Sequence, residues 1–216
     1  MITLVNYGLG NIQAFANIYK RLNIPVVVAN TSDELARAEK IILPGVGAFD
    51  WAMTRLSESG MRACLDDLVL VKKCPILGVC VGMQMMAKCS DEGKLPGLGW
   101  IDAEVRHFGQ GVGGEKFGVG NTVLGMKGLA LPHMGWNDVA PQKAEYLFKG
   151  MQTGARFYFL HSYYFLSQNP DTVLAVTDYN GPFTSAICSG NMVGTQFHPE
   201  KSHQWGIQLL KNFAEL

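Results

Sequence analysis

The chain has 216 residues, 48% of them hydrophobic and 17% charged, a composition that excludes a disordered polypeptide. This length can bury a substantial core but is short for two, so we predict a single domain over residues 1–216. Lysine plus arginine and aspartate plus glutamate both number 18, so the formal net charge is zero. Without a basic surplus to neutralise phosphates, nucleic acid is not expected as a partner.

Targeting signals and cysteine usage point to a reducing compartment. The first 30 residues lack the basic start, apolar stretch and cleavage site of a signal peptide, and no apolar run approaches the length of a membrane span. The cysteines are odd in number and form no C-x-x-C pair, which argues against a disulfide framework or a thiolate metal site: Cys64, Cys74, Cys80, Cys89 and Cys188. We expect a cytoplasmic protein that makes no membrane contact and holds no metal or other cofactor.

In the first 80 residues, short and wholly apolar runs alternate with amphipathic helical patterns. The predicted strands are 2–6, 26–29, 41–43 and 75–79, and the predicted helices are 12–22, 31–38, 48–58 and 61–72. Thr31 and Glu34 fit a capping box at the start of the second helix. Apolar strands separated by helices are typical of a parallel sheet covered on both faces.

The second half has more closely spaced apolar runs, which predict antiparallel strands appended to the parallel core. These runs are 101–108, 155–161, 172–178, 183–188 and 192–197, followed by a closing helix near 203–214. Residues 109–128 contain eight glycines and little periodicity, so we predict an irregular surface loop there. The fold class is therefore α/β, with a central mostly parallel sheet, flanking helices and additional antiparallel strands.

Cys80 stands in the most informative segment of the chain. An apolar strand leads into Gly78-x-Cys80-x-Gly82, and a helical pattern begins at once. This is the pattern of a nucleophile elbow, with cysteine in place of serine. A thiol at the start of a helix is favoured as thiolate, and the N–H of Val81 can then hold a developing oxyanion. An isolated cysteine is more often a buried packing residue, and the flanking glycines bring the nucleophile level with that interpretation, so both stay open for Cys80 taken alone.

A nucleophilic cysteine needs a base, and His198 is the preferred candidate. It lies at the end of the predicted strand 192–197, where active sites of open α/β sheets collect. Glu200 follows two positions later and can orient the imidazole towards Cys80, as in a Cys-His-Glu triad. A third element is the loop 43–49, whose glycines permit backbone angles that can aim an N–H group into the site.

Together these features resemble class I, triad-type glutamine amidotransferases, whose fold is flavodoxin-like. The resemblance narrows to the glutaminase subunits of imidazole glycerol phosphate synthase and covers nearly the whole chain except 109–131. Six motifs in order carry it: YGLGN (7–11), LPGVGAF (43–49), GMQ (82–84), PHMGWN (132–137), FYFLHSY (157–163) and GTQFHPEK (194–201).

The resemblance implies that the enzyme hydrolyses L-glutamine through a thioester on Cys80, with His198 and Glu200 completing the triad. It further implies an oxyanion hole and a binding site for glutamine. The oxyanion hole would be formed by Val46, Gly47 and Val81, and the glutamine site by Gly45, Gln84, Glu92, Ser162 and Tyr163.

By the same resemblance, the ammonia passes to a (β/α)₈-barrel cyclase subunit in a heterodimer. That subunit forms imidazole glycerol phosphate and an aminoimidazole carboxamide nucleotide in histidine biosynthesis. Asn11 and Trp136 match positions expected at the interface, although an aromatic residue such as Trp136 also suits a core or an ordinary surface. The free glutaminase is expected to be nearly silent until the partner and its ligand reshape the loop 44–47.

Some positions depart from the family pattern, and three other functions remain open. Asn6 stands where aspartate is frequent, and Val79 and Val81 replace Ile and Leu, changes that keep size and backbone role. The segment 109–131 is longer than usual and lies near the expected docking surface. The chain can therefore also be a paralogue that supplies ammonia to another synthase, such as one amidating a surface-polysaccharide sugar. Further alternatives are a stand-alone cysteine hydrolase and a non-catalytic subunit.

Overall fold

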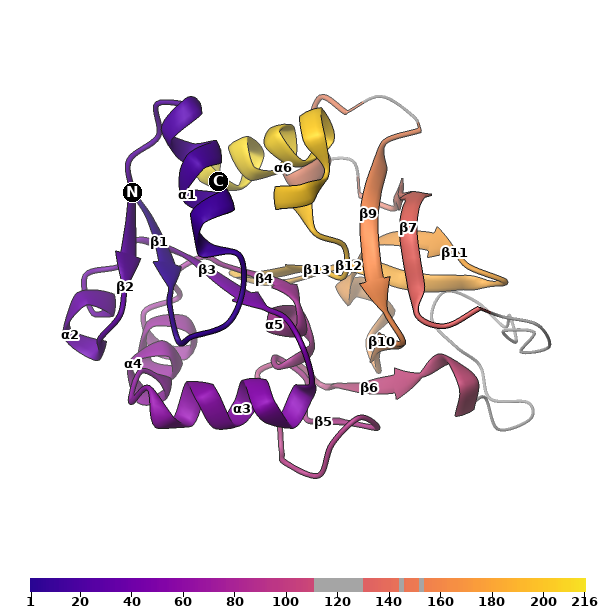
Figure 1. Ribbon diagram of the computed structural model, residues 1–216, viewed down its shortest axis with the longest axis horizontal. Helices are drawn as coiled ribbons and strands as arrows, with labels where there is room; N and C mark the ends of the chain where they lie inside the picture. Colours follow the sequence, from indigo (N-terminus) through magenta and orange to yellow (C-terminus); the bar gives the residue numbers. More distant parts are fainter. Residues whose placement is uncertain (111–129, 144–145, 152–153) are drawn as a thin grey trace.

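The computed structural model describes residues 1–110, 130–143, 146–151 and 154–216. The predicted loop 109–128 therefore falls almost entirely outside the described residues. Helices and strands are arranged in three layers, with a central sheet between two sets of helices (Figure 1). The sheet has eight strands in the order β2-β1-β3-β4-β13-β12-β11-β8. This confirms the predicted α/β fold with a mostly parallel sheet and additional antiparallel strands.

The parallel half of this sheet is built from the apolar runs at the start of the chain and one strand near its end. The five strands β2, β1, β3, β4 and β13 are parallel to one another. Their bounds are β1 Ile2–Val5, β2 Val26–Ala29, β3 Lys40–Gly45, β4 Ile76–Cys80 and β13 Met192–Thr195. The strands β1, β4 and β13 are buried throughout and β3 nearly so, which explains why their sequences are apolar without alternation.

Two predictions about the strand near 192–197 are wrong in detail. We expected an antiparallel strand, but β13 pairs in parallel with β4 and only its other edge is antiparallel, with β12. The strand also ends at Thr195, two residues earlier than predicted, because Gln196 and Phe197 form a bend, although the Gln196 N–H still donates to the Ser185 carbonyl of β12 at 2.9 Å. His198 therefore follows this bend and pairs with Tyr158 of β9 in an isolated antiparallel bridge.

The antiparallel extension is formed by β12 Pro182–Ser189, β11 Val173–Asp178 and β8 Ala140–Pro141. Two smaller sheets lie beside it. One contains β10 Tyr163–Ser167, β6 Ala103–His107 and β5 Cys89–Ser90, and the other pairs β7 His133–Asp138 with β9 Arg156–His161. The strands β7 and β9 run side by side at one end of the molecule (Figure 1). Apolar runs predicted β9 but not β7, β5, β8 or β10.

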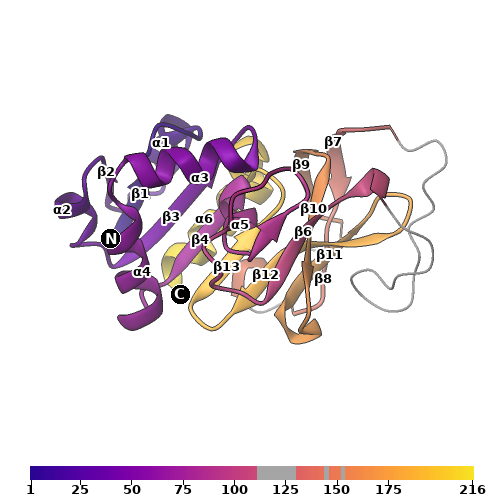
Figure 2. The ribbon, with the colours of Figure 1, turned by 90° about the horizontal axis from the view of Figure 1, so that it is seen from below.

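Helices cover both faces of the sheet. The helices α1 Ile12–Arg21 and α6 His203–Glu215 lie on one side, and α3 Phe49–Glu58 and α4 Arg62–Asp66 on the other (Figure 1 and Figure 2). The predicted helix 61–72 is in fact α4 followed by one π-helical turn, Asp67–Val71, and the predicted helix 31–38 is the single turn α2 Ser32–Leu35. Short 3₁₀ turns lie at Phe108–Gln110, Tyr146–Phe148, Pro170–Thr172 and Pro199–Lys201.

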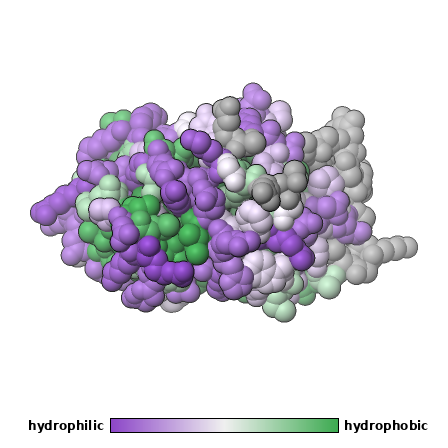
Figure 3. All heavy atoms as spheres, turned by 90° about the horizontal axis from the view of Figure 1, so that it is seen from above, coloured by the Kyte–Doolittle hydropathy of each residue, from purple (hydrophilic) through white to green (hydrophobic). Residues whose placement is uncertain are grey.

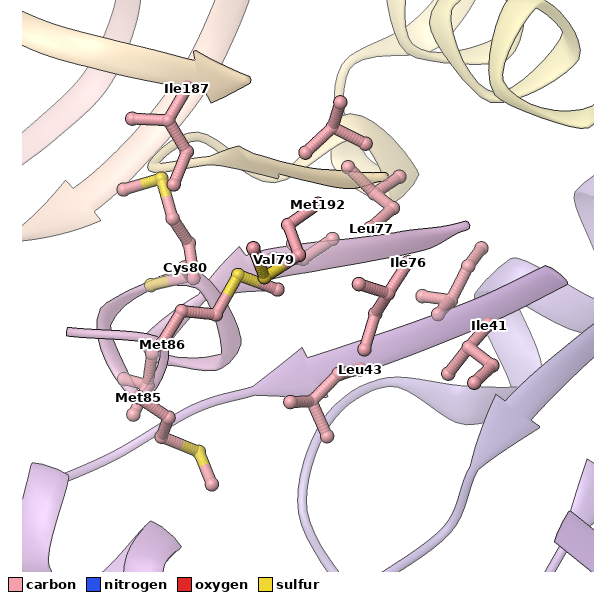
Figure 4. Close-up of a cluster of buried hydrophobic side chains, with 14 of the residues drawn as sticks. Ile41, Leu43, Ile76, Leu77, Val79, Cys80, Met85, Met86, Ile187 and Met192 are labelled. Carbon is pink, nitrogen blue, oxygen red and sulfur yellow. The ribbon is translucent and has the colours of Figure 1, made fainter. Parts of the chain in front are cut away.

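The hydrophobic core runs beneath the nucleophile elbow. Figure 4 shows Met85 and Met86 below Cys80, with side chains of β3 and β4 beside them. These side chains are at most 4% exposed, so β4 delivers Cys80 to the sheet edge on a closely packed base. Backbone that is buried and packed on all sides cannot move readily, which favours a fixed position for the thiol.

The face seen from above is largely hydrophilic, and the most prominent hydrophobic area lies in the left half of the view (Figure 3). Within the described part of the chain, no helix has both the length and the apolar character needed to cross a membrane.

Candidate active site

The elbow places Cys80 at the junction of β4 and the short helix α5 Val81–Gln84. Cys80 has φ 54° and ψ −114°, a backbone conformation that is rare for residues other than glycine. Gly82 permits the close packing of this turn, because a Cβ there would lie 2.0 Å from the Leu43 carbonyl oxygen. Because α5 has only four residues, its macrodipole is small. A thiolate at Cys80 would be stabilised mainly by the free N–H groups at the start of this helix.

His198 and Glu200 form a buried pair beside this cysteine. The His198 Nδ1 atom lies 2.9 Å from the Glu200 Oε1 atom, and both side chains are at most 3% exposed. The second carboxylate oxygen of Glu200 is buried without a hydrogen-bond partner among the described residues. Because Nδ1 faces the carboxylate, Nε2 is left to face the thiol, as the triad arrangement requires.

Ser202 and β9 hold the backbone of His198. The His198 N–H donates to the Tyr158 carbonyl at 2.9 Å, and the Ser202 hydroxyl donates to the His198 carbonyl at 2.6 Å. The same hydroxyl accepts from the Tyr158 N–H at 3.0 Å. Ser202 is fully buried and thus ties the histidine to the neighbouring strand from both sides. Sequence reasoning missed this residue, because it lies just outside the motif at 194–201.

The charge state of His198 follows from its two neighbours. Burial lowers the pKa of the imidazole, but the Cys80 thiolate and the Glu200 carboxylate, through charge and hydrogen bonding, raise it from 6.5 to about 10. The imidazolium form of His198 is therefore favoured at neutral pH. An imidazolium beside a cysteine favours the nucleophilic thiolate and holds a proton ready for a leaving group.

A cavity of about 290 Å³ opens over Cys80, a size suited to a small ligand. Most of the residues singled out from the sequence meet here; Gly45, Glu200, Asn11 and Trp136 do not line it. The lining residues are Val46, Gly47, Cys80, Val81, Gln84, Glu92, Pro132, Leu160, His161, Ser162, Tyr163, His198 and Lys201. Pro132, Leu160, His161 and Lys201 were not predicted as site residues, although each lies within a quoted motif.

The loop predicted to complete the oxyanion hole reaches the cavity with Val46 and Gly47, and Val81 lines the same cavity. Gly47 has φ +84°, a backbone conformation that favours glycine. Nothing lies within 4 Å of the position that a Cβ would occupy there, so backbone conformation and not crowding favours glycine at this position. Gly45 packs against the elbow instead, where an added Cβ would lie 2.3 Å from the Gly82 nitrogen.

Tyr7 supports this loop from below. Its hydroxyl donates to the Pro44 carbonyl at 2.7 Å, and Gly10 packs against the same proline. The pKa of Tyr7 is raised by burial and by the nearby Cys80 charge, so its hydroxyl keeps its proton and remains a donor. The first motif therefore supports the loop 44–47 and does not line the cavity itself.

Glu92 lies on the wall of the cavity and also caps α3. Its Oε2 atom accepts a hydrogen bond from the Phe49 N–H at 2.8 Å. Burial raises the pKa of Glu92, and the Phe49 N–H opposes this rise. Asp50 fixes the loop that carries Glu92 by accepting from the N–H groups of Lys94 and Leu95.

The two predicted interface residues lie outside the cavity. Asn11 is exposed and caps α1 by accepting from the Ala14 N–H at 3.3 Å. Trp136 is 38% exposed and stacks on His203, with 5.1 Å between the ring centres. Trp136 is thus a surface residue of β7 and not part of the core.

Comparisons with known proteins decide the family. The family model described as glutamine amidotransferase class-I matches residues 3–216. The chain belongs to the class-I glutamine amidotransferases. Among curated relatives, the chain is 60% identical to a protein of Bdellovibrio bacteriovorus named imidazole glycerol phosphate synthase subunit HisH, with 100% of both chains covered. It is 47% identical to the protein of the same name from Leptospira interrogans, again over 100% of both chains. Within the family, the chain therefore belongs with the HisH subunits, as the motifs indicated.

Solved structures agree on the fold. A structure described as a glutamine amidotransferase gives a TM-score of 0.71 at 17% identity, covering 100% of this chain and 99% of that one. The structure of PurLQS from Thermotoga maritima gives a TM-score of 0.67 at 16% identity, covering 99% of this chain and 97% of that one. At these identities the likeness supports the fold and nothing more specific.

Proposed function

We propose that this chain, over a single domain spanning 1–216, is the glutaminase subunit of an imidazole glycerol phosphate synthase. It hydrolyses L-glutamine to glutamate and ammonia and passes the ammonia to a (β/α)₈-barrel cyclase subunit in histidine biosynthesis. The observation that carries the proposal is the strained Cys80 elbow opening into a cavity beside the buried His198–Glu200 pair. The full-length similarity to proteins named HisH supports the choice of synthase.

In the first chemical step, the Cys80 thiolate attacks the side-chain amide carbon of glutamine. The carbonyl oxygen becomes an oxyanion, which the N–H groups of Val81 and of the loop at Val46–Gly47 stabilise. The His198 imidazolium donates its proton to the departing nitrogen, so ammonia leaves and a glutamyl thioester remains on Cys80. Glu200 keeps the imidazole oriented and stabilises its positive charge.

In the second step, the neutral His198 takes a proton from water, and the hydroxide attacks the thioester. Collapse of the tetrahedral intermediate releases glutamate and restores the thiolate and the imidazolium. The product leaves as the γ-carboxylic acid and ionises in water, so the sum is glutamine plus water giving glutamate, ammonia and a proton. The charge that develops in both steps is held by N–H groups and by the histidine.

The walls of the cavity suit the amino-acid end of the substrate. The carboxylate of Glu92 can receive the α-ammonium group, while Gln84, Ser162 and Tyr163 offer hydrogen-bonding groups around the side chain. Lys201 also borders the cavity and can attract the α-carboxylate or a group of the partner. Its Nζ atom lies 5.5 Å from the centre of the Tyr158 ring on β9, a cation–π contact.

The outer face of β7 and β9 is the best candidate for the partner interface. Met134 is 65% exposed, Leu160 39% and Trp136 38%, and these side chains alternate with less exposed residues along the two strands. Exposed apolar side chains grouped beside a site mark an interaction surface. Ammonia is protonated in neutral water and then stops being a nucleophile. A partner docked on this face of β7 and β9 would shield the ammonia from water during its transfer.

The proposal is tested by measuring glutamate release from glutamine by this chain mixed with the matching cyclase subunit, with and without its ribulosyl nucleotide. We expect strong stimulation by the nucleotide, and its loss in Cys80→Ala. Cys89→Ala is the matched control, because Cys89 is an exposed thiol outside the cavity.

Activity that disappears in Cys80→Ala but ignores the nucleotide would keep the glutaminase and overturn the assignment of the acceptor. The chain would then be a paralogue that supplies another synthase. Activity that survives in Cys80→Ala would overturn the nucleophile itself.

A further inference from the structure

A hydrogen-bonded chain of side chains lies behind the cavity and reaches its wall. On the inner faces of β7 and β9, His133 Nδ1 lies 3.0 Å from His161 Nε2. The other nitrogen of His133 lies 3.2 Å from Asn137 Nδ2, and the other nitrogen of His161 lies 2.7 Å from the Tyr163 carbonyl oxygen. His133 and His161 are 3% and 6% exposed, so neither exchanges these partners freely with water.

The donor-to-acceptor direction of this series of hydrogen bonds is fixed at its Asn137 end. The Asn137 Nδ2 group donates to the Asp178 carbonyl at 2.8 Å, and Asn137 Oδ1 accepts from the Asp138 N–H at 2.8 Å. The amide can therefore present only its N–H to His133. His133 must accept with Nε2, and a neutral His133 then carries its proton on Nδ1 and donates it to His161.

The Tyr163 end fixes the same polarity independently. A carbonyl oxygen can only accept, so His161 must carry its proton on Nδ1. A neutral His161 then presents a bare Nε2 atom, which is the acceptor that His133 requires. The two ends agree on one arrangement, with both imidazoles neutral and both protonated on Nδ1. Burial lowers the pKa of His133 to about 4 and that of His161 to about 3, which keeps both neutral.

Beyond Tyr163 the chain continues to the nucleophile. The Gln84 Nε2 group donates to the Tyr163 carbonyl at 3.3 Å and to Gln196 Oε1 at 3.0 Å. Because Gln196 accepts with its oxygen, its Nε2 group faces Cys80, and it donates to the sulfur at 3.6 Å. An N–H group aimed at the sulfur favours the thiolate over the thiol. Gln84 and Gln196 are 3% and 0% exposed.

We propose that His133 and His161 are positioning residues for the glutaminase step. Their imidazoles form a chain of fixed tautomers that anchors the Tyr163 carbonyl and, through Gln84 and Gln196, holds an N–H donor on the Cys80 sulfur. The role in glutamine hydrolysis rests on the proposed function, but the effect on the Cys80 thiolate does not, because it concerns the nucleophile alone.

Packing is the competing explanation for His133. Its ring stacks on Tyr179 with 3.9 Å between centres and on Phe159 with 4.6 Å. A ring that serves packing is replaced well by phenylalanine and poorly by asparagine. A hydrogen-bonding role predicts the reverse, because the asparagine amide can place an N–H near the position of Nδ1 and phenylalanine has no donor.

The test is the rate at which iodoacetamide alkylates Cys80 in the free chain, followed by mass spectrometry of the Cys80 peptide. The exposed Cys89 serves as an internal reference in the same sample. We expect His133→Phe to slow the alkylation of Cys80 about fivefold, corresponding to roughly 1 kcal/mol, and His133→Asn to stay within about twofold of the native rate. Alkylation of Cys89 should be unchanged in both.

A double-mutant cycle tests whether the effect of His133 on Cys80 alkylation is transmitted through the hydrogen-bonded side chains. Gln196→Leu removes the final donor to the sulfur and should slow alkylation at least as much as His133→Phe. If both act on the same path, His133→Phe combined with Gln196→Leu is no slower than Gln196→Leu alone. Multiplying effects would overturn the proposal, as would an asparagine variant slower than the phenylalanine variant.

The native protein gives an answer even if His133→Phe does not fold. Long-range ¹H–¹⁵N spectra of histidine-labelled protein report which ring nitrogen carries the proton. Protonation of both His133 and His161 on Nδ1 supports the chain, and an Nε2 proton on either residue overturns it. None of these measurements requires glutamine or a partner, so a failure here is distinct from a failure of the proposed function.

Discussion

Buried histidines occupy two regions around the same cavity, and the two regions differ in charge. His198 lies at the edge of the parallel sheet beside Cys80 and Glu200, and the pKa of its imidazole is raised to about 10. His161 lies on β9 in the neighbouring two-stranded sheet, and the pKa of its imidazole is lowered to about 3. Burial lowers the pKa of both rings, so burial does not explain the difference.

The groups that contact each imidazole explain the difference in pKa. His198 faces a carboxylate and a thiolate, which stabilise the imidazolium, whereas His161 faces a carbonyl oxygen and a second imidazole. One histidine is therefore able to exchange protons with a substrate, and the other serves as a neutral link in a hydrogen-bonded chain. A buried histidine beside a pocket is assigned a role by its partners and not by its burial.

The largest expected effect comes from removing the carboxylate that distinguishes the first region. Glu200→Gln keeps the shape of the side chain but removes the negative charge, so the pKa of His198 falls and the thiolate loses part of its counter-charge. We expect kcat for glutamine hydrolysis to drop about 10²- to 10⁴-fold, by comparison with the loss of the orienting acid in other triads. The alkaline limb of the pH profile of kcat, where His198 loses its proton, should move to lower pH.

Glu58→Gln is the control for this change, because Glu58 is an exposed partner of Arg55 on α3. An unchanged pH profile in Glu200→Gln would mean that Glu200 does not set the charge of His198. The two histidine regions would then differ for another reason.

The second region is probed on its outer face by Trp136→Ala. The substitution removes an exposed ring from β7 and leaves the inner-face chain through His133 in place. We expect affinity for the cyclase subunit to fall about 10- to 100-fold, the range of an aromatic hot spot, with unchanged Cys80 alkylation in the free chain. Trp51→Ala is the matched control, because Trp51 is 53% exposed on α3. Equal losses for the two tryptophans would reject the β7–β9 face as the docking surface.

The opposite charge states also predict opposite effects of pH on stability. His133 and His161 have folded-state pKa values lowered from 6.5 to about 4 and about 3, so their stability contribution is complete above pH 6.5 and is lost as the pH falls towards these values. Each can contribute a slope of up to about 1.4 kcal/mol per pH unit in this range. The raised pKa of His198 acts the other way, and its contribution is lost as the pH rises through about 10.

Urea unfolding from neutral pH down to about pH 4.5 measures this slope. His133→Asn should flatten it, because one buried titrating group is gone. The same slope in the variant and the native protein would show that His133 does not titrate in this window.

The smallest expected effect is at Ser202, which ties His198 to β9. Ser202→Ala leaves the Tyr158 N–H without its partner, and an unpaired buried group costs about 1–3 kcal/mol of stability. Because the His198 N–H bond to Tyr158 remains, we expect kcat to fall only about three- to tenfold. Ser167→Ala is the control, because Ser167 is the half-buried last residue of β10 and, among the described residues, its hydroxyl bonds only the nearby backbone of Asn169. A loss of kcat as large as that in Glu200→Gln would mean that the hydrogen bonds of Ser202 to the backbone, and not the Glu200 carboxylate, set the position of the imidazole.

Local sequence patterns were enough to predict the first region. Flanking glycines mark the Cys80 elbow, and a carboxylate two residues after His198 marks the pair, because both features are encoded by neighbours in the chain. Apolar runs likewise predicted β1, β2, β3 and β4. The roles proposed for these residues remain predictions until they are tested.

The second region could not be predicted from spacing. His133 and His161 lie 28 residues apart and meet only through the register of β7 and β9, in which they are directly paired. The strand β7 itself was missed, since its sequence HMGWND contains a glycine and polar residues that weaken a strand signal. Ser202 and Gln196 acquire partners only through tertiary contacts with β9 and Gln84.

The most direct measurement of the central comparison is the protonation of the imidazoles in the native chain at slightly alkaline pH, by ¹⁵N NMR of histidine-labelled protein. Single His→Asn variants assign the signals. We predict an imidazolium at His198 and neutral rings at His133 and His161, with the proton of each neutral ring on Nδ1. A neutral His198, or a charged His161, would contradict the account.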